Sequence, residues 1–207
     1  MSTMKIARAY TMGARAEAAE ATRLAILDAV VTLAGERMLS DIALDDVAER
    51  AGVSVQTVLR RFGSRAGLFE QAHQHGREQV IEERRAPVGD VAAAVRVLAE
   101  HYERRGRAAV LFLAQEEREP FAARITTQGR ALHRSWVEQV FAPFLPRTRS
   151  EREQAVDLLV VACDVYTWKL LRLDRGLSRA QTTRRTERLV RSVLAGLGTV
   201  SEGKSDV

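Results

Sequence analysis

Apolar residues recur three and four positions apart along most of the chain, which is typical of amphipathic helices. The first such stretch covers residues 17–38, and further ones predict helices over residues 44–51, 54–62 and 65–84. No stretch alternates apolar and polar residues for long enough to predict a strand. The pattern therefore predicts an all-α protein.

The segment 85–89, Arg-Ala-Pro-Val-Gly, interrupts this periodicity and predicts a domain boundary. Beyond it, Val91, Val95, Leu98 and Tyr102 share one face of a fifth helix. A short apolar helix is expected near residues 108–117, followed by longer ones over 121–141, 151–173 and 180–197. Pro143 and Pro146 end the helix expected over residues 121–141.

The expected helix 151–173 is apolar around nearly its whole circumference, with the run DLLVVACDVYTWKLL. A helix of this kind must be covered on every side, and one small domain can hardly do so. We therefore expect a homodimer formed by the helices at 151–173 and 180–197.

Four segments are expected in order along the chain. Residues 1–15 carry Lys5, Arg8 and Arg15 without a hydrophobic face and predict a flexible basic arm, whose contact with a partner is left open. Residues 16–65 form a three-helix domain, residues 66–85 a connecting helix, and residues 86–207 a helical domain for ligand binding and dimerisation.

The most informative stretch lies at residues 42–62. Leu44, Val47, Ala48 and Ala51 are spaced as the inner face of a two-turn helix. Gly52 follows where the chain must leave that helix, a position that commonly needs a positive φ. Ser54 can then cap the next helix, which gives the order of a helix-turn-helix, whose second helix enters the DNA major groove.

The outward face of that second helix follows from its geometry. Val58 and Phe62 lie four residues apart and define the buried side. At about 100° per residue, Gln56 and Arg60 then point away from the core, flanked by Thr57 and Leu59. Glutamine, arginine and apolar side chains can all contact DNA bases or phosphates.

Residues 20–70 closely resemble the tetracycline-repressor (TetR) family. The resemblance is carried by Val47-Ala48-x-x-Ala51-Gly52-Val53-Ser54, by Thr57 with Phe62, and by Ser64-Arg65-x-x-Leu68. It implies an all-helical homodimer, a palindromic double-stranded DNA operator and a small-molecule effector bound by the C-terminal domain. By position it implies base reading by Val55, Gln56 and Leu59, and phosphate contacts by Thr57, Arg60, Arg61 and Arg65.

The chain departs from the family pattern at three positions. Ala43 stands where a Ser or Thr usually caps the first helix of the motif, so that cap is missing unless Asp41 or a water replaces it. Leu59 and Arg61 replace the aromatic residues common after Thr57. These departures concern which operator sequence is read.

Composition narrows the classes of function further. The net charge of +5 arises from residues 86–207, so it does not itself indicate DNA binding, but the window from Arg50 to Phe69 holds four arginines and no acid. Motifs typical of hydrolases, metalloenzymes or nucleotide binding are missing, so we expect no enzyme, metal or cofactor.

His101 and His133 are interpreted as structural or pocket histidines whose hydrogen bonds are satisfied within the protein. Without a signal core or an apolar run of membrane length, and with the single Cys163, a cytoplasmic protein is expected.

The C-terminal helices carry more apolar residues than a helix with a single buried face requires. This surplus favours an apolar cavity that could hold an effector. Asp164 lies within an apolar run and is expected either to pair across the dimer or to face the ligand. The expected function is a repressor released from its operator by the effector, and the alternative is a helical ligand-binding or interaction protein without DNA affinity. The residues expected to line the cavity are Phe112, Gln115, Ile125, Trp136, Asp164, Tyr166 and Trp168.

Overall fold

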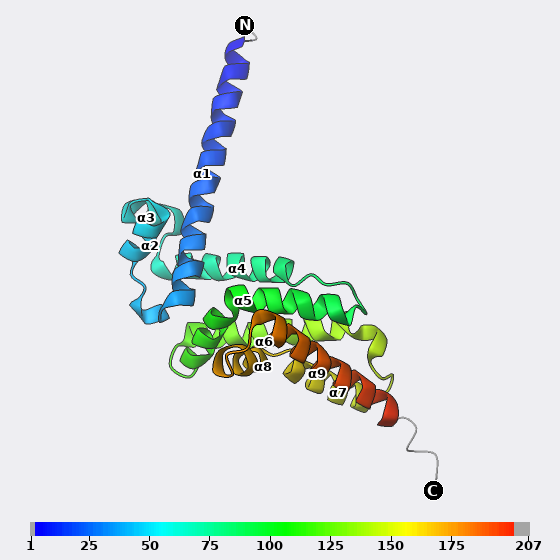
Figure 1. The fold of residues 1–207 in the computed structure, drawn as a ribbon. Coiled ribbons are helices and arrows are strands. Elements are labelled where there is room, and N and C mark those ends of the chain that lie inside the picture. Colours follow the sequence, from blue (N-terminus) through cyan, green and yellow to red (C-terminus); the bar gives the residue numbers. More distant parts are fainter. Residues whose placement is uncertain (1–2, 201–207) are drawn as a thin grey trace. The chain divides into compact units, whose positions relative to one another are not determined.

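The computed structural model describes residues 3–200, and side chains for residues 15–197. These described residues form helices and contain no strand, which confirms the predicted all-α class (Figure 1). The chain divides into two compact units, an N-terminal unit of Met1–Gln79 and a C-terminal unit of Val80–Val207. The division lies within a helix, ahead of the segment 85–89 at which the sequence predicts a boundary.

The N-terminal unit is built from helices whose bounds follow the local sequence signals. Within the motif, the observed helices coincide with the predicted ones to within one residue. Their bounds are α1 Thr3–Glu36, the short 3-10 turn η1 Leu39–Asp41, α2 Leu44–Ala51, α3 Val55–Phe62 and α4 Arg65–Glu83, the last of which continues into the C-terminal unit.

Helix α1 extends further toward the N-terminus than expected. It begins at Thr3, so residues 3–15 are helical and not the loose arm that the sequence predicts. Alanine, methionine, lysine and arginine prevail in this stretch, and these residues favour a helix without needing a packed face. Residues 1 and 2 of the predicted arm lie outside the described residues.

A single hydrophobic core holds the N-terminal unit together. Helix α1 packs against α2, and α2 against α3. The predicted inner faces of α2 and α3 point to this core: Val47, Ala48, Val58 and Phe62 are buried, and Leu44 and Ala51 are partly buried. The most deeply buried side chains of this core are Ile26, Leu27, Leu33, Ile42, Val47, Val58 and Leu68.

The C-terminal unit is a separate bundle. Helix α5 packs against α6, α8 and α9, and α7 packs against α6 and α9. No helix in residues 3–200 has the length and apolar character required to cross a membrane. The elements are α5 Val91–Gln115, α6 Pro120–Val140, the turn η2 Ala142–Phe144, α7 Arg149–Ala162, α8 Val165–Lys169, the π-helical turn η3 Leu170–Asp174, and α9 Arg179–Val200.

The separate short helix expected over residues 108–117 was predicted wrongly. Those residues belong to α5, which runs without interruption from Val91 to Gln115. The helix continues through Gly106, because a single glycine inside a helix costs only about 1 kcal/mol and is tolerated where packing requires it. Gly106 is buried, and its packing partner is Trp168.

The single helix expected over residues 151–173 is interrupted. Helix α7 ends at Ala162, and a new helix begins after Asp164, whose carboxylate accepts a hydrogen bond from the backbone N–H of Tyr166 at 2.8 Å. An aspartate that caps its own following turn competes with helix continuation. The apolar neighbours of Asp164 concealed this local signal.

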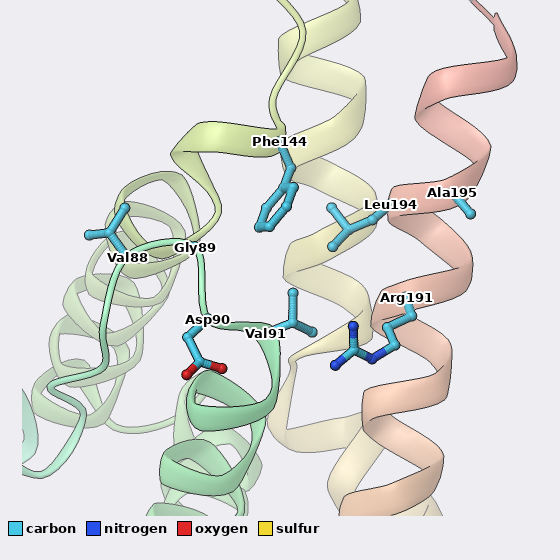
Figure 2. A pocket seen from close by; sticks show the side chains of 8 residues that line it. All are labelled: Val88, Gly89, Asp90, Val91, Phe144, Arg191, Leu194 and Ala195. Carbon is cyan, nitrogen blue, oxygen red and sulfur yellow. The ribbon is translucent and has the colours of Figure 1, made fainter.

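The C-terminal unit carries an open groove of about 720 Å³. Figure 2 shows Val91, Phe144 and Leu194 facing the space between the start of α5 and α9. Arg191 lies at its edge and forms an ion pair with Glu187 on the same helix, at 2.7 Å. The groove therefore combines apolar side chains with the charged residues Asp90 and Arg191, and its arginine is already partnered.

Candidate nucleic-acid interface

The turn between α2 and α3 has the geometry that the sequence predicts. Gly52 ends α2 with φ at +67° and ψ at +35°, in the left-handed region. The N–H of Val53 reaches back to the carbonyl of Ala48 at 2.9 Å. This bond closes the end of α2 in a way typical of a glycine cap and sets the direction in which α3 leaves.

Ser54 begins α3 as its N-cap. Its Oγ accepts the backbone N–H of Thr57 at 3.2 Å and lies 3.0 Å from the Thr57 hydroxyl. The cap satisfies one of the free amides of the first turn, which stabilises a helix of only eight residues. The hydroxyl of Thr57, predicted to contact phosphate, is thereby held beside the N-terminus of α3.

Helix α3 presents a polar face opposite its buried one. Val58 and Phe62 are buried, whereas Gln56 and Arg60 are exposed and Leu59 is 39% exposed. This orientation agrees with the one derived from helical spacing. Val55 and Thr57 are partly buried at the margin of the face, and base reading by Val55, Gln56 and Leu59 stays a prediction.

The arginines between Arg50 and Phe69, a segment without acidic residues, differ in the contacts that they make within the protein. Arg50 forms two bonds of 2.9 Å to the carboxylate of Glu36. Within the described residues, Arg60 is exposed and makes no hydrogen bond or ion pair. Arg61 is partly buried, and its Nε has no hydrogen-bond partner in the part of the chain that the structure describes. Arg60 is therefore the most available of these cations for a phosphate.

Arg65 makes internal contacts. Its guanidinium donates to the carbonyls of Leu39 at 2.6 Å and Ile42 at 3.3 Å, and it lies 4.3 Å above the centre of the Phe69 ring. These bonds attach the turn before α2 to the start of α4. They give Arg65 a structural role, and its phosphate contact stays a prediction.

Helix α2 begins without the side-chain cap that the family pattern leads one to expect at residue 43. The carboxylate of Asp46 accepts the backbone N–H of Ala43 at 2.8 Å, and it also pairs with Arg37 at 3.1 Å. This contact is one half of a capping box, in which the third helical residue reaches back to the cap. Asp46 supplies it, and not Asp41, because Asp46 stands in the required position.

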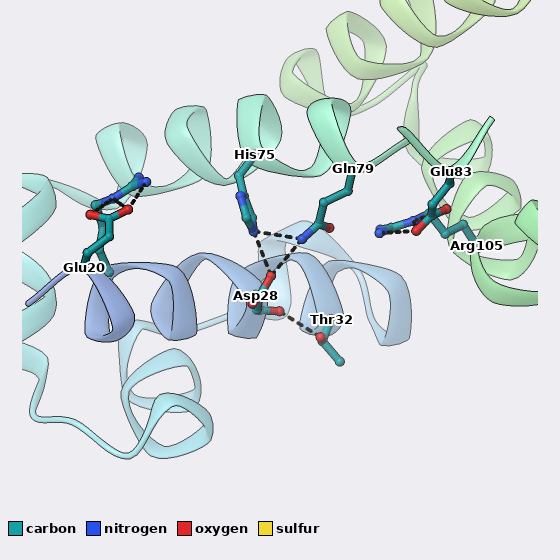
Figure 3. Close-up of polar contacts among 8 residues, drawn as sticks. Glu20, Asp28, Thr32, His75, Gln79, Glu83 and Arg105 are labelled. Atoms are coloured by element: carbon teal, nitrogen blue, oxygen red, sulfur yellow. Dashed lines mark hydrogen bonds and ion pairs between the residues drawn. The ribbon is translucent and has the colours of Figure 1, made fainter. Parts of the chain in front are cut away.

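A polar cluster joins α1 to the part of α4 that belongs to the N-terminal unit (Figure 3). The carboxylate of Asp28 lies 2.8 Å from Nε2 of His75 and accepts from the amide of Gln79 at 3.1 Å. The cluster holds the two helices in register on the exposed side of the core. His73 and His75 are separated by one residue, but among the described residues neither belongs to a group of side chains that could hold a metal ion.

The residues predicted to line an effector cavity are dispersed within the C-terminal unit. Asp164 and Trp168 line a small cavity of about 10 Å³, and none of the seven lines the larger groove. Trp136 donates its Nε1–H to the carbonyl of Arg84 at 2.7 Å, and Tyr166 is 51% exposed. Gln115 is buried and donates to the carbonyl of Leu111, while Phe112 and Ile125 are partly buried.

A polar network at the start of the C-terminal unit was not predicted from the sequence. Glu83 accepts from Nε of Arg105 at 3.0 Å (Figure 3). It also accepts from Nδ1 of His101 at 3.0 Å. Burial raises the pKa of Glu83, but these hydrogen bonds outweigh it and lower the pKa to about 2. Arg84, the next residue, is buried against His133. The run Glu-Glu-Arg-Arg at 82–85 resembles an ordinary solvated helix end, so only the fold reveals this network.

The sequence of the N-terminal unit matches a known protein family. Residues 26–72 match the family model described as bacterial regulatory proteins of the tetR family. These residues include α2, α3 and the turn between them, so the match covers the whole candidate interface. No curated protein matches the chain by sequence.

Solved structures share the fold over most of the chain. A transcriptional regulator from Rhodococcus sp. RHA1 has a TM-score of 0.62 at 21% identity, and the similarity covers 86% of this chain and 96% of that one. A tetR-family transcriptional regulator from Streptomyces coelicolor has a TM-score of 0.62 at 19% identity, covering 88% and 85%. A TetR-like transcriptional regulator from Rhodococcus sp. RHA1 has a TM-score of 0.60 at 17% identity, covering 84% and 96%.

Proposed function

Because the chain carries the DNA-binding domain of the TetR family of bacterial regulatory proteins, we propose that it is a homodimeric repressor, released from a palindromic operator by a small-molecule effector. The observation that carries this proposal is the exposed face of α3. The side chains of Gln56, Leu59 and Arg60 on this face form no hydrogen bond or ion pair within the described residues, and a glycine turn and a serine cap set the position of the helix. The protein acts by binding in the cytoplasm and not by catalysis.

Reading of the operator is assigned to α3. Gln56 can bond an adenine edge in the major groove, and Val55 and Leu59 can meet thymine methyl groups. Arg60 and Arg61, with the hydroxyl of Thr57, contact the phosphates that position the helix. Arg65 supports the same surface by holding the turn before α2, and its remaining donors face a phosphate.

The dimer is assigned to a patch of exposed apolar side chains on the C-terminal unit, which we call the α7–α9 face. Soluble monomers rarely expose large apolar side chains in such number on adjoining elements, and such a patch indicates an interaction site. A two-fold axis through the face would make it self-complementary and present two copies of α3 to one side of DNA. The residues of the α7–α9 face are Leu158, Val161, Tyr166, Leu170 and Leu189.

The effector is assigned to the interior of the C-terminal unit. Binding of effector and operator must be coupled reciprocally, so each weakens the other by the same factor. The alternative function is a helical ligand-binding or interaction protein without DNA affinity. The free cation of Arg60 favours the regulator over this alternative.

Selection from random DNA duplexes with the purified full-length protein tests the proposal. We expect recovery of an inverted repeat, and binding to it that weakens steeply as salt increases, because arginines on phosphates release counterions. Gln56→Ala should relax specificity at one symmetric base pair, at about 1–3 kcal/mol per lost bidentate contact. Recovery of no preferred sequence, with salt-independent binding, would support the alternative.

A further inference from the structure

Arg84 is a buried cation without a counter-ion. It is 6% exposed, and no carboxylate among the described residues forms an ion pair with it. Within the described residues, its guanidinium donates a single hydrogen bond, from Nη2 to Nδ1 of His133 at 2.7 Å, and its buried Nε has no partner. Arginine is almost never buried unless it is paired, because an isolated charge is costly to remove from water.

The one hydrogen-bond partner of Arg84 does not neutralise it. Burial, and then the charge of Arg84, lower the pKa of His133 to about 4, so the imidazole is neutral near pH 7. Its Nε2–H donates to the carbonyl of Val160 at 3.2 Å, which leaves the lone pair of Nδ1 to accept from Arg84. The face of Trp136 covers the guanidinium at 4.7 Å. These contacts orient the cation and leave its charge in place.

The acids near Arg84 are committed elsewhere. Glu83 is its neighbour in the chain, but the Glu83 carboxylate binds His101 and Arg105. The charge of Asp164 acts on Arg84 without direct contact, and the Asp164 carboxylate accepts the N–H of Tyr166. Burial lowers the pKa of Arg84. The folded protein therefore contains a desolvated positive charge that its own acids leave unpaired.

A small cavity lies one helical turn from these contacts. The carbonyl of Val160 accepts from His133, and Cys163, three residues later, lines a cavity of about 10 Å³ together with Tyr102, Asp164 and Thr182. The hydroxyl of Thr182 is buried and has no hydrogen-bond partner among the described residues. Leu98 and Trp168 form apolar walls of the same cavity.

We propose that Arg84 is the recognition residue for an anionic effector, a small molecule that joins a carboxylate to an apolar body. The inference rests on the proposed function and specifies the chemistry of its effector. A carboxylate offers about four acceptor positions and a negative charge, which suits the unpaired Nε of the Arg84 guanidinium. It supplies the missing negative charge, while a neutral or cationic ligand would leave the buried guanidinium unpaired.

Entry of such a ligand requires a local rearrangement. The cavity has room for about one water molecule. Trp168 forms part of its wall and belongs to α8, a helix of five residues between the Asp164 cap and the π-helical turn η3. Displacement of α8 would widen the cavity and move Trp168. Trp136 lies against the guanidinium of Arg84, so each tryptophan reports on a different part of the proposed site.

Titration of the full-length protein with benzoate and octanoate, against benzamide and octanamide as neutral matches, tests the proposal. Calorimetry and tryptophan emission should show saturable binding of at least one carboxylate and at least tenfold weaker binding of its amide. The Trp168→Phe variant leaves Trp136, which lies against Arg84, as the single reporter. Arg84→Met should weaken carboxylate binding by about 10- to 100-fold. Arg130→Met, which removes an equal charge from the exposed pair with Glu116, should leave it unchanged.

Equal binding of acid and amide, absence of binding for all four probes, or undiminished binding by a folded Arg84→Met variant would overturn the proposal. If Arg84→Met loses its helical circular dichroism, the acid-to-amide comparison in the unaltered protein still decides. Operator binding is measured on the same preparations. Carboxylate binding without operator binding would refute the proposed function and leave the binding role of Arg84 intact. Operator binding without carboxylate binding would refute only the role of Arg84.

Discussion

The indole of Trp168 occupies the space that a side chain at Gly106 would need. A Cβ added to Gly106 would lie 2.5 Å from Cζ3 of Trp168 and 2.7 Å from Cη2. The ring is also anchored, since its Nε1–H donates to the carboxylate of Glu103 at 3.3 Å. The glycine in the middle of α5 is therefore explained by the close approach of α8 and not by any bend in α5.

Gly106→Ala should destabilise the protein in spite of the higher helix propensity of alanine. The added methyl group forces the Trp168 ring from its site, and overpacking of this kind costs about 1–3 kcal/mol. Gly129→Ala is the matched control, because a Cβ at Gly129 meets nothing within 4 Å, and alanine there should stabilise by about 0.5–1 kcal/mol. Urea denaturation measures both, and a Gly106→Ala variant as stable as the control would contradict the packing argument.

Stability should decline between pH 6.5 and pH 4 because of His133. Its pKa is 6.5 in the unfolded chain and about 4 in the fold, where burial and the charge of Arg84 oppose protonation. Between these values the unfolded state binds more protons, so stability is complete above pH 6.5 and falls as the pH approaches 4. The loss is on the order of 3 kcal/mol, at 1.36 kcal/mol per pKa unit.

His133→Gln tests the origin of this decline. Glutamine can accept from Arg84 and donate to Val160 as the neutral imidazole does, but it does not titrate. The free energy of unfolding, measured from pH 7.5 to pH 4.5, should fall more shallowly in the variant. The lower limit coincides with the unfolded pKa of Glu83, 4.5, so most of the stability that Glu83 loses on the way to its folded pKa of about 2 lies below the measured range. Parallel curves would show that His133 is not the titrating group.

Arg60→Ala should weaken operator binding and reduce its salt dependence. If each Arg60 contacts one phosphate, the log–log slope of affinity against salt should fall by about one per site, or two per dimer. Arg107→Ala removes an exposed arginine from α5 and should leave the slope unchanged. Fluorescence anisotropy at several salt concentrations measures the slope. An unchanged slope with altered base preference would make Arg60 a base reader, and unchanged affinity would exclude both roles.

The N-terminal unit was predictable because its signals are local. Gly52 must adopt a positive φ at the end of α2, and Ser54 caps α3 through an amide three residues away. Each signal lies within one turn of the residue that it affects. The outward orientation of Gln56 and Arg60 follows from helical geometry once Val58 and Phe62 are recognised as core.

The C-terminal unit was less predictable because its decisive contacts join distant residues. Arg84 and His133 are 49 residues apart. The sequence predicted a structural or pocket role for His133 but did not indicate its partner, and Arg84 lies in a charged run that is typical of an exposed helix end. Asp164 could have been recognised as a cap, but its apolar neighbours on both sides favoured a continuous helix. The dispersal of the seven predicted pocket residues has the same cause: composition indicates surplus apolar surface without indicating which helices face each other.

Val161→Asp should convert the dimer to monomers. Val161 is 65% exposed on α7, within the α7–α9 face, and a two-fold axis brings two copies of that face together. The substitution places a charge in each half of an apolar interface, where neither has a partner, so the dissociation constant should rise by about 100-fold or more.

Val88→Asp is the matched control, because Val88 is 55% exposed in the same unit but lies on the groove outside this face. Light scattering across a concentration series should show a monomer for Val161→Asp and a dimer for Val88→Asp. A Val161→Asp dimer of unchanged affinity would place the interface elsewhere, and loss of operator affinity together with the dimer would connect this face to DNA binding.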